Sequence, residues 1–344
     1  MVEKEEKRVA EDLEETIYDE RQLFFDDVFY QWMDYKVNLD GLSERSFDRY
    51  LSDKHRFFDK GSRLERIPFD RITEEDVEFF IRNAIIAEKL THRGCARIKL
   101  ILRGVFRFGY RRKMTKLHIG ECLDNLEISK CLFAKRVVED EKEVFTREEE
   151  ELIFNKVLQK PSLTGLGLLL LFYTGLRIGE LAVLREKDIF EDYICVSKTE
   201  TCHDIRDEEG RVIRRKYEVK PFPKTEAGVR RVVIPPAAIS IIEMIREKRL
   251  KVQEDYLFVG RGGRMHAPVF SQKLRNLCNE IGIPQRSAHK IRKTYATRLI
   301  NAGLEKSIIV KQMGHTDFSI TDRYYYFNDA KKEYIRTRIT NAFV

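Results

Sequence analysis

Apolar side chains recur every three or four residues through the first third of the chain, a spacing that places them on one face of a helix. The pattern predicts four amphipathic helices, which begin near Leu23, after Ser43, at Thr73 and at about residue 91. Thr73 is a helix N-cap candidate, because its hydroxyl can accept a hydrogen bond from a free backbone N–H group of the first turn. Residues 23–130 are therefore expected to form a helical domain.

A charged stretch without an apolar face interrupts this pattern at residues 136–145 (RVVEDEKEVF), and 131–145 is interpreted as an interdomain linker. Thr146 and Glu149 then have the spacing of a capping box, in which each side chain binds a backbone N–H group of the other residue. A second domain is expected to begin there and to extend over 146–344.

The centre of this second domain is rich in β-branched and aromatic residues, which favour strands. Strands are predicted at 193–197, 215–219 and 229–235, and helices over 236–250 and after Ser287. The predicted fold class is mainly α: a helical domain plus a mixed α+β domain with a small antiparallel sheet at its edge.

A polar stretch separates the first two of these strands. Cys202 to Arg211, which includes Gly210, is expected to be a loop. Residues 200–214 are interpreted as an insertion, which is either a solvated loop or a hairpin that contacts DNA through Arg211, Arg214 and Arg215.

Charge is distributed unevenly along the chain. The 344 residues carry a net charge of +7, but residues 1–22 hold nine acids and four bases, so the remainder carries +12. A chain of 344 residues suggests about two domains. The positive balance after residue 22 suits a polyanionic partner such as nucleic acid. The acidic extension itself is expected to be either a helix with alternating charge or a disordered segment.

Cysteines and apolar runs exclude other classes of protein. The six cysteines form no C-x-x-C motif and no spacing typical of a zinc site. The most apolar stretch, Leu166–Tyr173, is far shorter than the roughly 20 residues that span a bilayer. The protein is expected to act in the cytoplasm, without a membrane partner or a metal.

Four cations in the last helix of the first domain lie four residues apart. Lys99, Arg103, Arg107 and Arg111 therefore form one positive stripe, and no acid interrupts residues 91–116. The stripe is either an ordinary solvated face or a surface that contacts DNA phosphates, and the absence of acids favours phosphate contact.

Four separate motifs carry candidate chemistry. Arg177 follows the end of an apolar helix in TGLRIGEL, and Lys224 lies in PKTEAGVRRVVIP. His289 and Arg292 share a helix face, and a GHTD motif precedes Tyr324. Each motif alone is weak evidence for a function. Arg177 could simply form a salt bridge with Glu180, and a single lysine in a turn is usually a solvated charge.

In this order, the four motifs resemble the motif set of tyrosine recombinases, the family of phage and conjugative-transposon integrases and chromosome-dimer resolvases. The resemblance covers about residues 144–330. It implies a site-specific DNA recombinase of the integrase or excisionase type, which acts as a tetramer on double-stranded DNA. Strands would be cut and rejoined through a covalent 3′-phosphotyrosyl intermediate, with no metal, cofactor or ATP.

The resemblance also implies a role for each matched residue. Arg177 and Arg292 would clamp the scissile phosphate, and Lys224 would protonate the leaving 5′-oxygen. His289 would assist proton transfer from the nucleophile, and His315 would hydrogen-bond the phosphate. Tyr324 would be the nucleophile, and Glu180 would support the pocket.

Several alternatives stay open at this point. Tyr325 and Tyr326 adjoin the expected nucleophile, and the family often has a histidine where Tyr326 stands. The tail 331–344 could pack in cis or dock on a neighbouring protomer.

Two other functions also stay open. A type IB topoisomerase-like or telomere-resolving enzyme would use similar residues, and a decayed integrase scaffold could bind DNA without cutting it.

Overall fold

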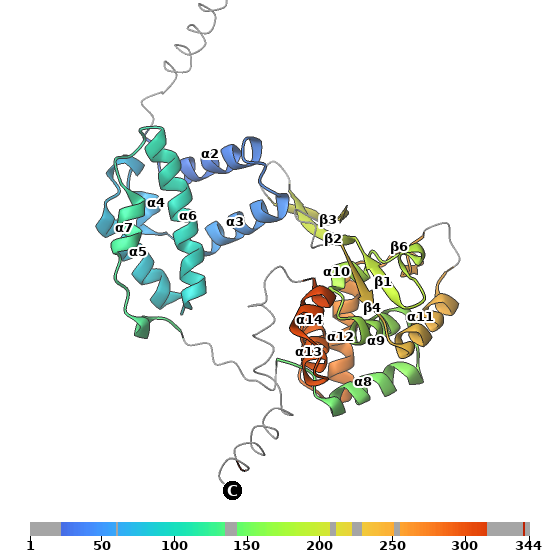
Figure 1. The fold of residues 1–344 in the computed structure, drawn as a ribbon. Coiled ribbons are helices and arrows are strands. Elements are labelled where there is room, and N and C mark those ends of the chain that lie inside the picture. The colour runs from blue at the N-terminus through green and yellow to red at the C-terminus, as the bar shows by residue number, and fades with distance from the viewer. Residues whose placement is uncertain are drawn as a thin grey trace, which may run out of the picture. The chain divides into compact units, whose positions relative to one another are not determined.

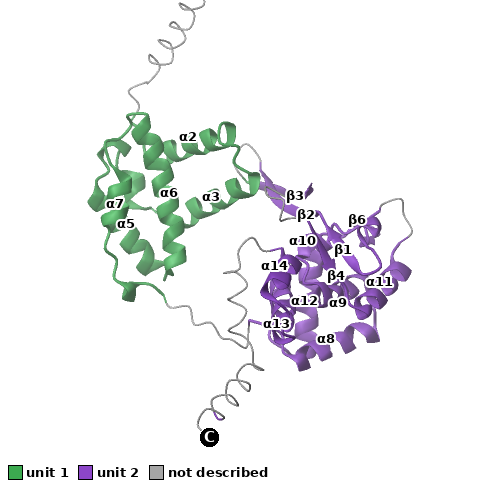
Figure 2. Ribbon diagram, in the orientation of Figure 1, with its two compact units in different colours: residues 1–136, 208–211 green, residues 137–207, 212–344 purple. Residues whose placement is uncertain are grey.

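The structure is a computed structural model, and it describes residues 22–59, 61–134, 143–206, 211–221, 229–250, 255–314 and 340. The chain divides into two compact units (Figure 2). Unit 1 comprises residues 1–136 and 208–211, and unit 2 comprises 137–207 and 212–344. Each unit is treated by itself below.

Unit 1 is entirely helical among the residues described (Figure 1). Its helices are α2 (Phe25–Asn38), α3 (Glu44–Phe57), α4 (Arg63–Arg66), α5 (Glu74–Ala87), α6 (His92–Arg111) and α7 (Ile119–Asn125). The four predicted helices are confirmed as α2, α3, α5 and α6. The N-cap at Thr73 is also confirmed, since its hydroxyl accepts a hydrogen bond from the Asp76 N–H group at 3.3 Å. The short helices α4 and α7 were not predicted.

Helix α6 is the centre of unit 1 and contacts α2, α3, α5 and α7. Its residues Ile98, Ile101, Leu102 and Val105 are completely buried. Gly104 lets α2 approach closely, because a Cβ atom there would lie 2.2 Å from the ring of Trp32. Burial of this apolar face supplies the main driving force for folding of the unit.

The described residues of unit 2 form helices and three pairs of strands. Its helices are α8 (Arg147–Gln159), α9 (Leu163–Thr174), α10 (Ile178–Leu181), α11 (Pro236–Lys248), α12 (Ala267–Ile281), α13 (Ala288–Asn301) and α14 (Lys306–Met313). Its strands are β1 (Tyr193–Val196), β2 (Lys198–Arg206), β3 (Val212–Pro221), β4 (Arg230–Val233), β5 (Val259–Gly260) and β6 (Gly263–Arg264). The mainly helical fold class with small antiparallel sheets is confirmed.

Helix α9 forms the core of unit 2. It is apolar on all sides and therefore suited to complete burial, and every residue from Gly165 to Phe172 is buried. Helices α8, α11, α12 and α13 pack around it. The capping box at the start of α8 is confirmed, because the Glu149 N–H group donates to the Thr146 hydroxyl at 3.2 Å.

All three strand pairs are antiparallel: β1 with β4, β2 with β3, and β5 with β6. The predicted loop from Cys202 to Arg211 is wrong in its first half, because β2 continues to Arg206 and Cys202 pairs with Tyr217 of β3. Polarity was the signal for a loop, but a two-stranded ribbon with much of its surface in water also accepts polar side chains. For example, the Oδ1 of Asp204 lies 3.5 Å from the Nε of Arg215 on the opposite strand. Within 200–214, residues 200–206 and 212–214 thus lie in the paired strands β2 and β3.

Candidate functional site

The motif TGLRIGEL forms a sharp connection between α9 and α10. Gly175 ends α9 with a φ of 60°, a left-handed conformation that glycine adopts without steric cost. A Cβ atom at this position would lie only 2.2 Å from the ring of Tyr295. The glycine therefore lets the chain turn beneath the tyrosine and places Arg177 at the N-cap position of α10.

Glu180 is the carboxylate around which the site is organised. It accepts hydrogen bonds from the backbone N–H and the Nη1 of Arg177, at 2.8 and 2.9 Å. Both of its oxygens also accept from Arg230, at 3.0 and 2.7 Å. Burial alone would raise the pKa of Glu180, but the hydrogen bonds and charge of Arg230, together with Arg292 and Arg177, lower it. The carboxylate is thus held ionised between cations.

Arg230 is a residue that sequence reasoning missed. It lies in β4, where buried and exposed residues alternate, and it shares the buried face with Val232. Its side chain is only 5% exposed. The segment RRVV carries no usable signal, because Val232 and Val233 are both apolar and only the structure shows that Val232, with Arg230 two positions earlier, faces the interior.

Arg292 lies on α13 and is the largest fully buried side chain among the residues described. Its Nη1 donates to the backbone oxygen of Gly175 at 2.5 Å, and its Nη2 donates to that of Met313. A buried guanidinium requires such partners, because an unpaired charge in the protein interior is costly. These contacts connect α13 to the turn after α9 and to the end of α14.

The three arginines meet at the C-terminal end of α14. Arg230 Nε donates to the oxygen of Gln312 at 3.0 Å, Arg292 to that of Met313, and Arg177 Nη2 to that of Gly314 at 3.2 Å. The last carbonyl groups of a helix lack partners within the helix, and cations stabilise that negative end. Three successive carbonyl groups are thus each bound by a different arginine, directly before His315.

His289 occupies the first turn of α13, three residues before Arg292. Its ring reaches solvent. Even so, partial desolvation by the surrounding chain, followed by the positive charges of Lys293, Arg292, Lys290 and Arg177, lowers its pKa. The imidazole is therefore neutral near pH 7 and can accept a proton.

A second carboxylate ties α13 to the beginning of unit 2. Glu143 forms ion pairs with Lys290 and Lys293, on either side of Arg292 along the helix. Burial opposes ionisation, but these two lysines lower the pKa of Glu143 to about 2. The Phe145 N–H group also donates to the Thr294 hydroxyl at 2.9 Å. These contacts fix the rotation of α13 and with it the direction of its functional face.

The structure thus brings together four of the predicted site residues, Arg177, Glu180, His289 and Arg292, within unit 2. Lys224, His315 and Tyr324 lie outside the described residues, as does the tail 331–344 except for residue 340. Their predicted roles stay predictions.

The positive stripe of α6 lies in unit 1, and its four members differ in their contacts. Lys99 Nζ donates to the backbone oxygen of Leu123 at 3.3 Å, and Arg103 pairs with Asp124 at 2.5 Å. Arg107 and Arg111 are exposed. The acid that pairs with Arg103 comes from α7, beyond the stretch in which the sequence lacks acids.

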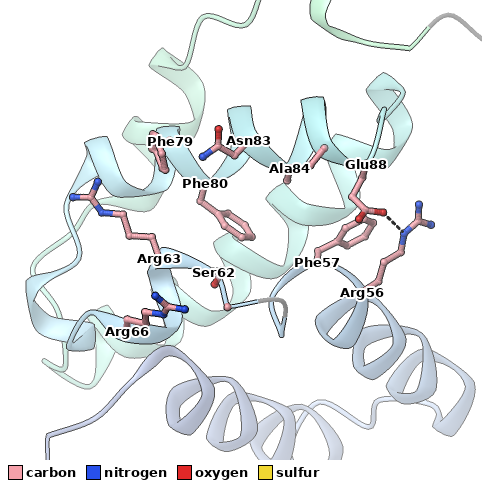
Figure 3. Close-up of a pocket in the computed structure, with 12 residues that line it drawn as sticks. Arg56, Phe57, Ser62, Arg63, Arg66, Phe79, Phe80, Asn83, Ala84 and Glu88 are labelled. Atoms are coloured by element: carbon pink, nitrogen blue, oxygen red, sulfur yellow. Dashed lines mark hydrogen bonds and ion pairs between the residues drawn. The ribbon is translucent and has the colours of Figure 1, made fainter.

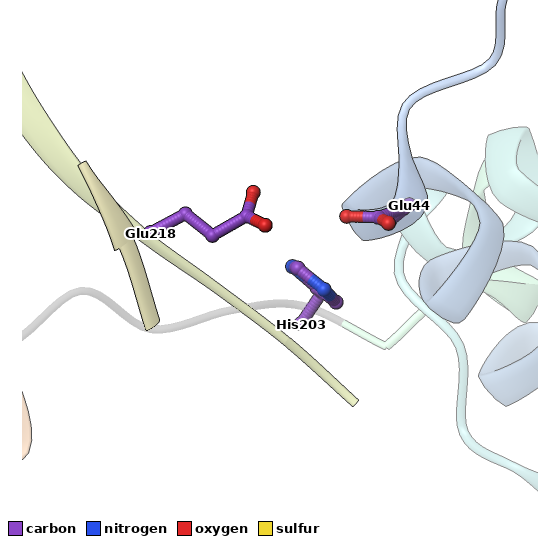
Figure 4. Close-up of side chains that lie close together, drawn as sticks. All are labelled: Glu44, His203 and Glu218. Carbon is purple, nitrogen blue, oxygen red and sulfur yellow. The ribbon is translucent and has the colours of Figure 1, made fainter. Parts of the chain in front are cut away.

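We call the group of Arg177, Glu180, Arg230 and Arg292 the arginine site. Among the described residues, acidic and histidine side chains also gather at two places outside it. In unit 1, Asp26 and Asp59 each lie 2.6 Å from Lys54 Nζ, so an ammonium group already compensates their charge. In unit 2, His203 of β2 and Glu218 of β3 lie close together (Figure 4). Glu44, drawn in the same figure, belongs to the other unit. Neither group includes a residue of the arginine site.

Comparison with protein families gives a clear match. The profile described as "Phage integrase family" matches residues 143–331, which is more than half of the chain. Among the described residues, no helix is both long and apolar enough to cross a membrane.

Two curated relatives illustrate the similarity in sequence. The tyrosine recombinase XerC-like protein of Caldanaerobacter subterraneus subsp. tengcongensis is 34% identical over 204 residues, which cover 55% of this chain and 51% of that protein. The transposase from transposon Tn916 of Enterococcus faecalis is 29% identical over 214 residues, covering 56% and 50%. The chain thus spans about half the length of the curated relatives it matches.

Two solved structures share the fold. The Tn1549 transposon integrase in complex with a circular intermediate DNA has a TM-score of 0.68 at 19% identity, covering 92% of this chain and 99% of that one. A lambda integrase tetramer bound to a Holliday junction has a TM-score of 0.62 at 15% identity, covering 92% and 80%.

Proposed function

Because this chain belongs to the phage integrase family, we propose that it is a site-specific DNA recombinase that cuts and rejoins strands through a 3′-phosphotyrosyl intermediate. The observation that carries the proposal is the convergence of Arg177 and Arg292 on the carbonyl groups of Gly314 and Met313. Two motifs far apart in the sequence thus meet at Met313 and Gly314, and Gly314 begins the GHTD motif.

The arginines suit a scissile phosphate. Attack on a phosphodiester places negative charge on the non-bridging oxygens, and fixed guanidinium groups stabilise that charge through paired hydrogen bonds. Glu180 holds Arg177 from one side, so the guanidinium is oriented before DNA binds. About 40% of the Arg177 side chain is exposed, which leaves it accessible to a phosphate.

The proposed reaction conserves the number of phosphoester bonds. The phenolic oxygen of Tyr324 attacks phosphorus and gives its proton to neutral His289. The bond from phosphorus to the 5′-oxygen breaks, and that oxygen takes a proton from Lys224. In the second half of the reaction, a free 5′-hydroxyl attacks the phosphotyrosine and gives its proton back to Lys224, while the released Tyr324 oxygen takes its proton back from His289. His315 is assigned a hydrogen bond to the phosphate. The bond energy is retained, so no ATP or metal is needed.

The units are assigned separate tasks. Residues 23–130 are proposed as the core DNA-binding domain, 131–145 as a linker and 146–344 as the catalytic domain, with 1–22 as an acidic extension. Lys99, Arg103, Arg107 and Arg111 would contact the phosphates of double-stranded DNA. The enzyme would act in the cytoplasm, in a bacterial or phage context.

Assembly on DNA is proposed to be tetrameric, by analogy with the lambda integrase tetramer on a Holliday junction. The tail 331–344 would dock on a neighbouring protomer and couple the active sites, with packing in cis as the alternative. A tail-deletion variant that still cleaves DNA but no longer forms tetramers on it would support exchange.

The function is tested with a pool of nicked DNA duplexes of varied sequence, whose short cleaved strand diffuses away and traps the intermediate. We expect a protein–DNA adduct that survives SDS and forms equally well in EDTA. DNA binding without any adduct would instead indicate a non-catalytic DNA-binding protein, and an adduct abolished by EDTA would contradict the metal-free reaction.

A further inference from the structure

A groove of about 390 Å³ opens on unit 1 between α3, α4 and α5, and none of the residues that line it belongs to α6. Its floor is formed by Phe57 and Phe80, which are 5% and 6% exposed, and Phe79 stands at its rim with half of its surface exposed. Figure 3 shows the rings of Phe57 and Phe80 between Arg63 and Arg66 at one end and Arg56 at the other. An apolar floor with a cationic rim suits an acidic, partly apolar peptide.

The charges of this groove are only partly compensated. Arg56 Nε lies 3.5 Å from Glu88 Oε2, and Arg63 Nε lies 2.8 Å from Asp76 Oδ1. Arg66 is exposed and has no carboxylate partner among the residues that the structure describes. Two of the three rim arginines are thus each paired with one carboxylate, and Arg66 adds a positive charge to the rim.

We propose that the acidic N-terminal extension of this chain, residues 1–21, binds in this groove, with Leu13 and Ile17 on the phenylalanine floor. Residues 11–20 (EDLEETIYDE) contain six acids and no base. Leu13 and Ile17 lie four residues apart, a spacing that places them on one side of a helix. Helix-in-groove recognition uses such apolar anchors, and the surrounding acids complement the arginine rim.

The start of the described chain lies beside the groove. The backbone oxygen of Leu23 accepts a hydrogen bond from the Phe69 N–H group at 2.8 Å, three residues after Arg66. The ring of Phe25 stacks on that of Phe58, next to Phe57, at a centroid distance of 4.9 Å. The described chain therefore begins beside residues that closely follow two groove-lining segments, 56–57 and 63–66.

The connection between the two apolar anchors and the described chain is short. Ile17 precedes Gln22 by five residues and Leu13 by nine. At about 1.5 Å per residue in a helix these spans reach roughly 8 and 14 Å, and at about 3.4 Å per residue when extended, roughly 17 and 31 Å. Binding within one chain needs no second molecule, and the short tether gives the extension a high effective concentration.

The test places the photo-crosslinker p-benzoylphenylalanine at position 17 of the full-length chain, in place of Ile17. Irradiation without DNA is followed by separation on a denaturing gel and peptide mapping. We expect a monomeric crosslinked species in which position 17 is joined to residues 56–66 or 79–88. A crosslink found only in dimers would indicate a second copy as the occupant and overturn the proposal. Crosslinks only to other regions, or none, would overturn it too.

Charge reversal tests the recognition itself. Arg66→Glu should lower the crosslink yield about fivefold, as expected when an ion pair is replaced by repulsion. Adding Glu14→Lys and Glu15→Lys should restore much of the yield. The matched control is Arg45→Glu, an exposed arginine of unit 1 outside the groove, which should leave the yield unchanged. Equal losses for Arg66→Glu and Arg45→Glu, or no recovery in the charge swap, would contradict the proposed contact.

Discussion

The guanidinium of Arg230 binds both carboxylate oxygens of Glu180, at 3.0 and 2.7 Å, although neither side chain is more than 5% exposed. Through this pair, β4 holds the carboxylate that in turn orients Arg177. A buried ion pair contributes little net stability when compared with apolar residues, but it is costly to break. The pair therefore acts chiefly as a positioning device for the proposed phosphate clamp.

Breaking this pair should destabilise unit 2. Arg230→Met leaves the carboxylate of Glu180 buried with one fewer cation, and we expect a loss of about 3 kcal/mol in the free energy of unfolding. Urea denaturation measures the loss. The matched control is Arg231→Met, because Arg231 is the exposed neighbour on the same strand, and its loss should stay below about 1 kcal/mol. Similar losses for the two variants would contradict the role of Arg230.

Gly175 should tolerate substitution less well than another glycine of similar backbone conformation. Gly175→Ala imposes the strain of a positive φ and also drives Cβ into the ring of Tyr295. Gly282 has a φ of 73°, but a Cβ atom there would meet no atom within 4 Å, so Gly282→Ala reports the backbone strain alone, about 1 kcal/mol. We expect Gly175→Ala to lose about 1–3 kcal/mol more in thermal unfolding. Equal losses would show that the contact with Tyr295 is unimportant.

The pH dependence of DNA cleavage should follow His289. Its pKa lies below the ordinary value of 6.5, so the neutral form that accepts a proton persists as the pH falls through 6.5. Cleavage should therefore decline only below that pH.

Lys293→Gln removes one of the positive charges that lower the pKa of His289, so the acidic limb of the rate profile should move to higher pH. Single-turnover cleavage rates between pH 5 and 8 measure this shift of the acidic limb. Lys187→Gln, a change at an exposed lysine in another part of unit 2, is the control and should leave the limb in place. A limb that moves to lower pH in Lys293→Gln would contradict the assignment.

Members of the positive stripe should contribute unequally to DNA binding. Arg107 and Arg111 are exposed, whereas the guanidinium of Arg103 is already held by Asp124. Each of Arg107→Ala and Arg111→Ala should lower the slope of log K against log salt concentration by about 1, because one phosphate contact is lost. Arg103→Ala should change the slope less. A salt titration in which Arg103→Ala has the largest effect would exclude this ranking.

Long helices were predictable because their apolar faces repeat over many turns. The structure places the start of α6 at His92, against a predicted start at about residue 91. Short elements offer no such repetition, and α4, with four residues, was missed. The hairpin arm of β2 was missed for another reason: its residues are polar, and only pairing with β3 explains why they form a strand.

The residues of the candidate site also differ in whether a local sequence pattern reveals them. Arg177 and Arg292 could be identified because their motifs have recognisable order and spacing. Arg230 could not, since a charged residue in a strand is normally exposed, and its buried partner Glu180 lies in a distant part of the sequence. The contacts of the three arginines with residues 312–314 likewise depend on tertiary packing, which no local pattern records.

The central claim is that Tyr324 is the residue that attacks DNA, and its neighbours Tyr325 and Tyr326 make this testable. Trypsin should release all three in one peptide, YYYFNDAK, which begins after Arg323. Fragmentation of this peptide from the trapped adduct identifies the tyrosine that carries the nucleotide. The account predicts a nucleotide on Tyr324, no adduct from Tyr324→Phe despite unchanged DNA affinity, and normal adducts from Tyr325→Phe and Tyr326→Phe. A nucleotide on Tyr325 or Tyr326, or an adduct formed by Tyr324→Phe, would contradict it.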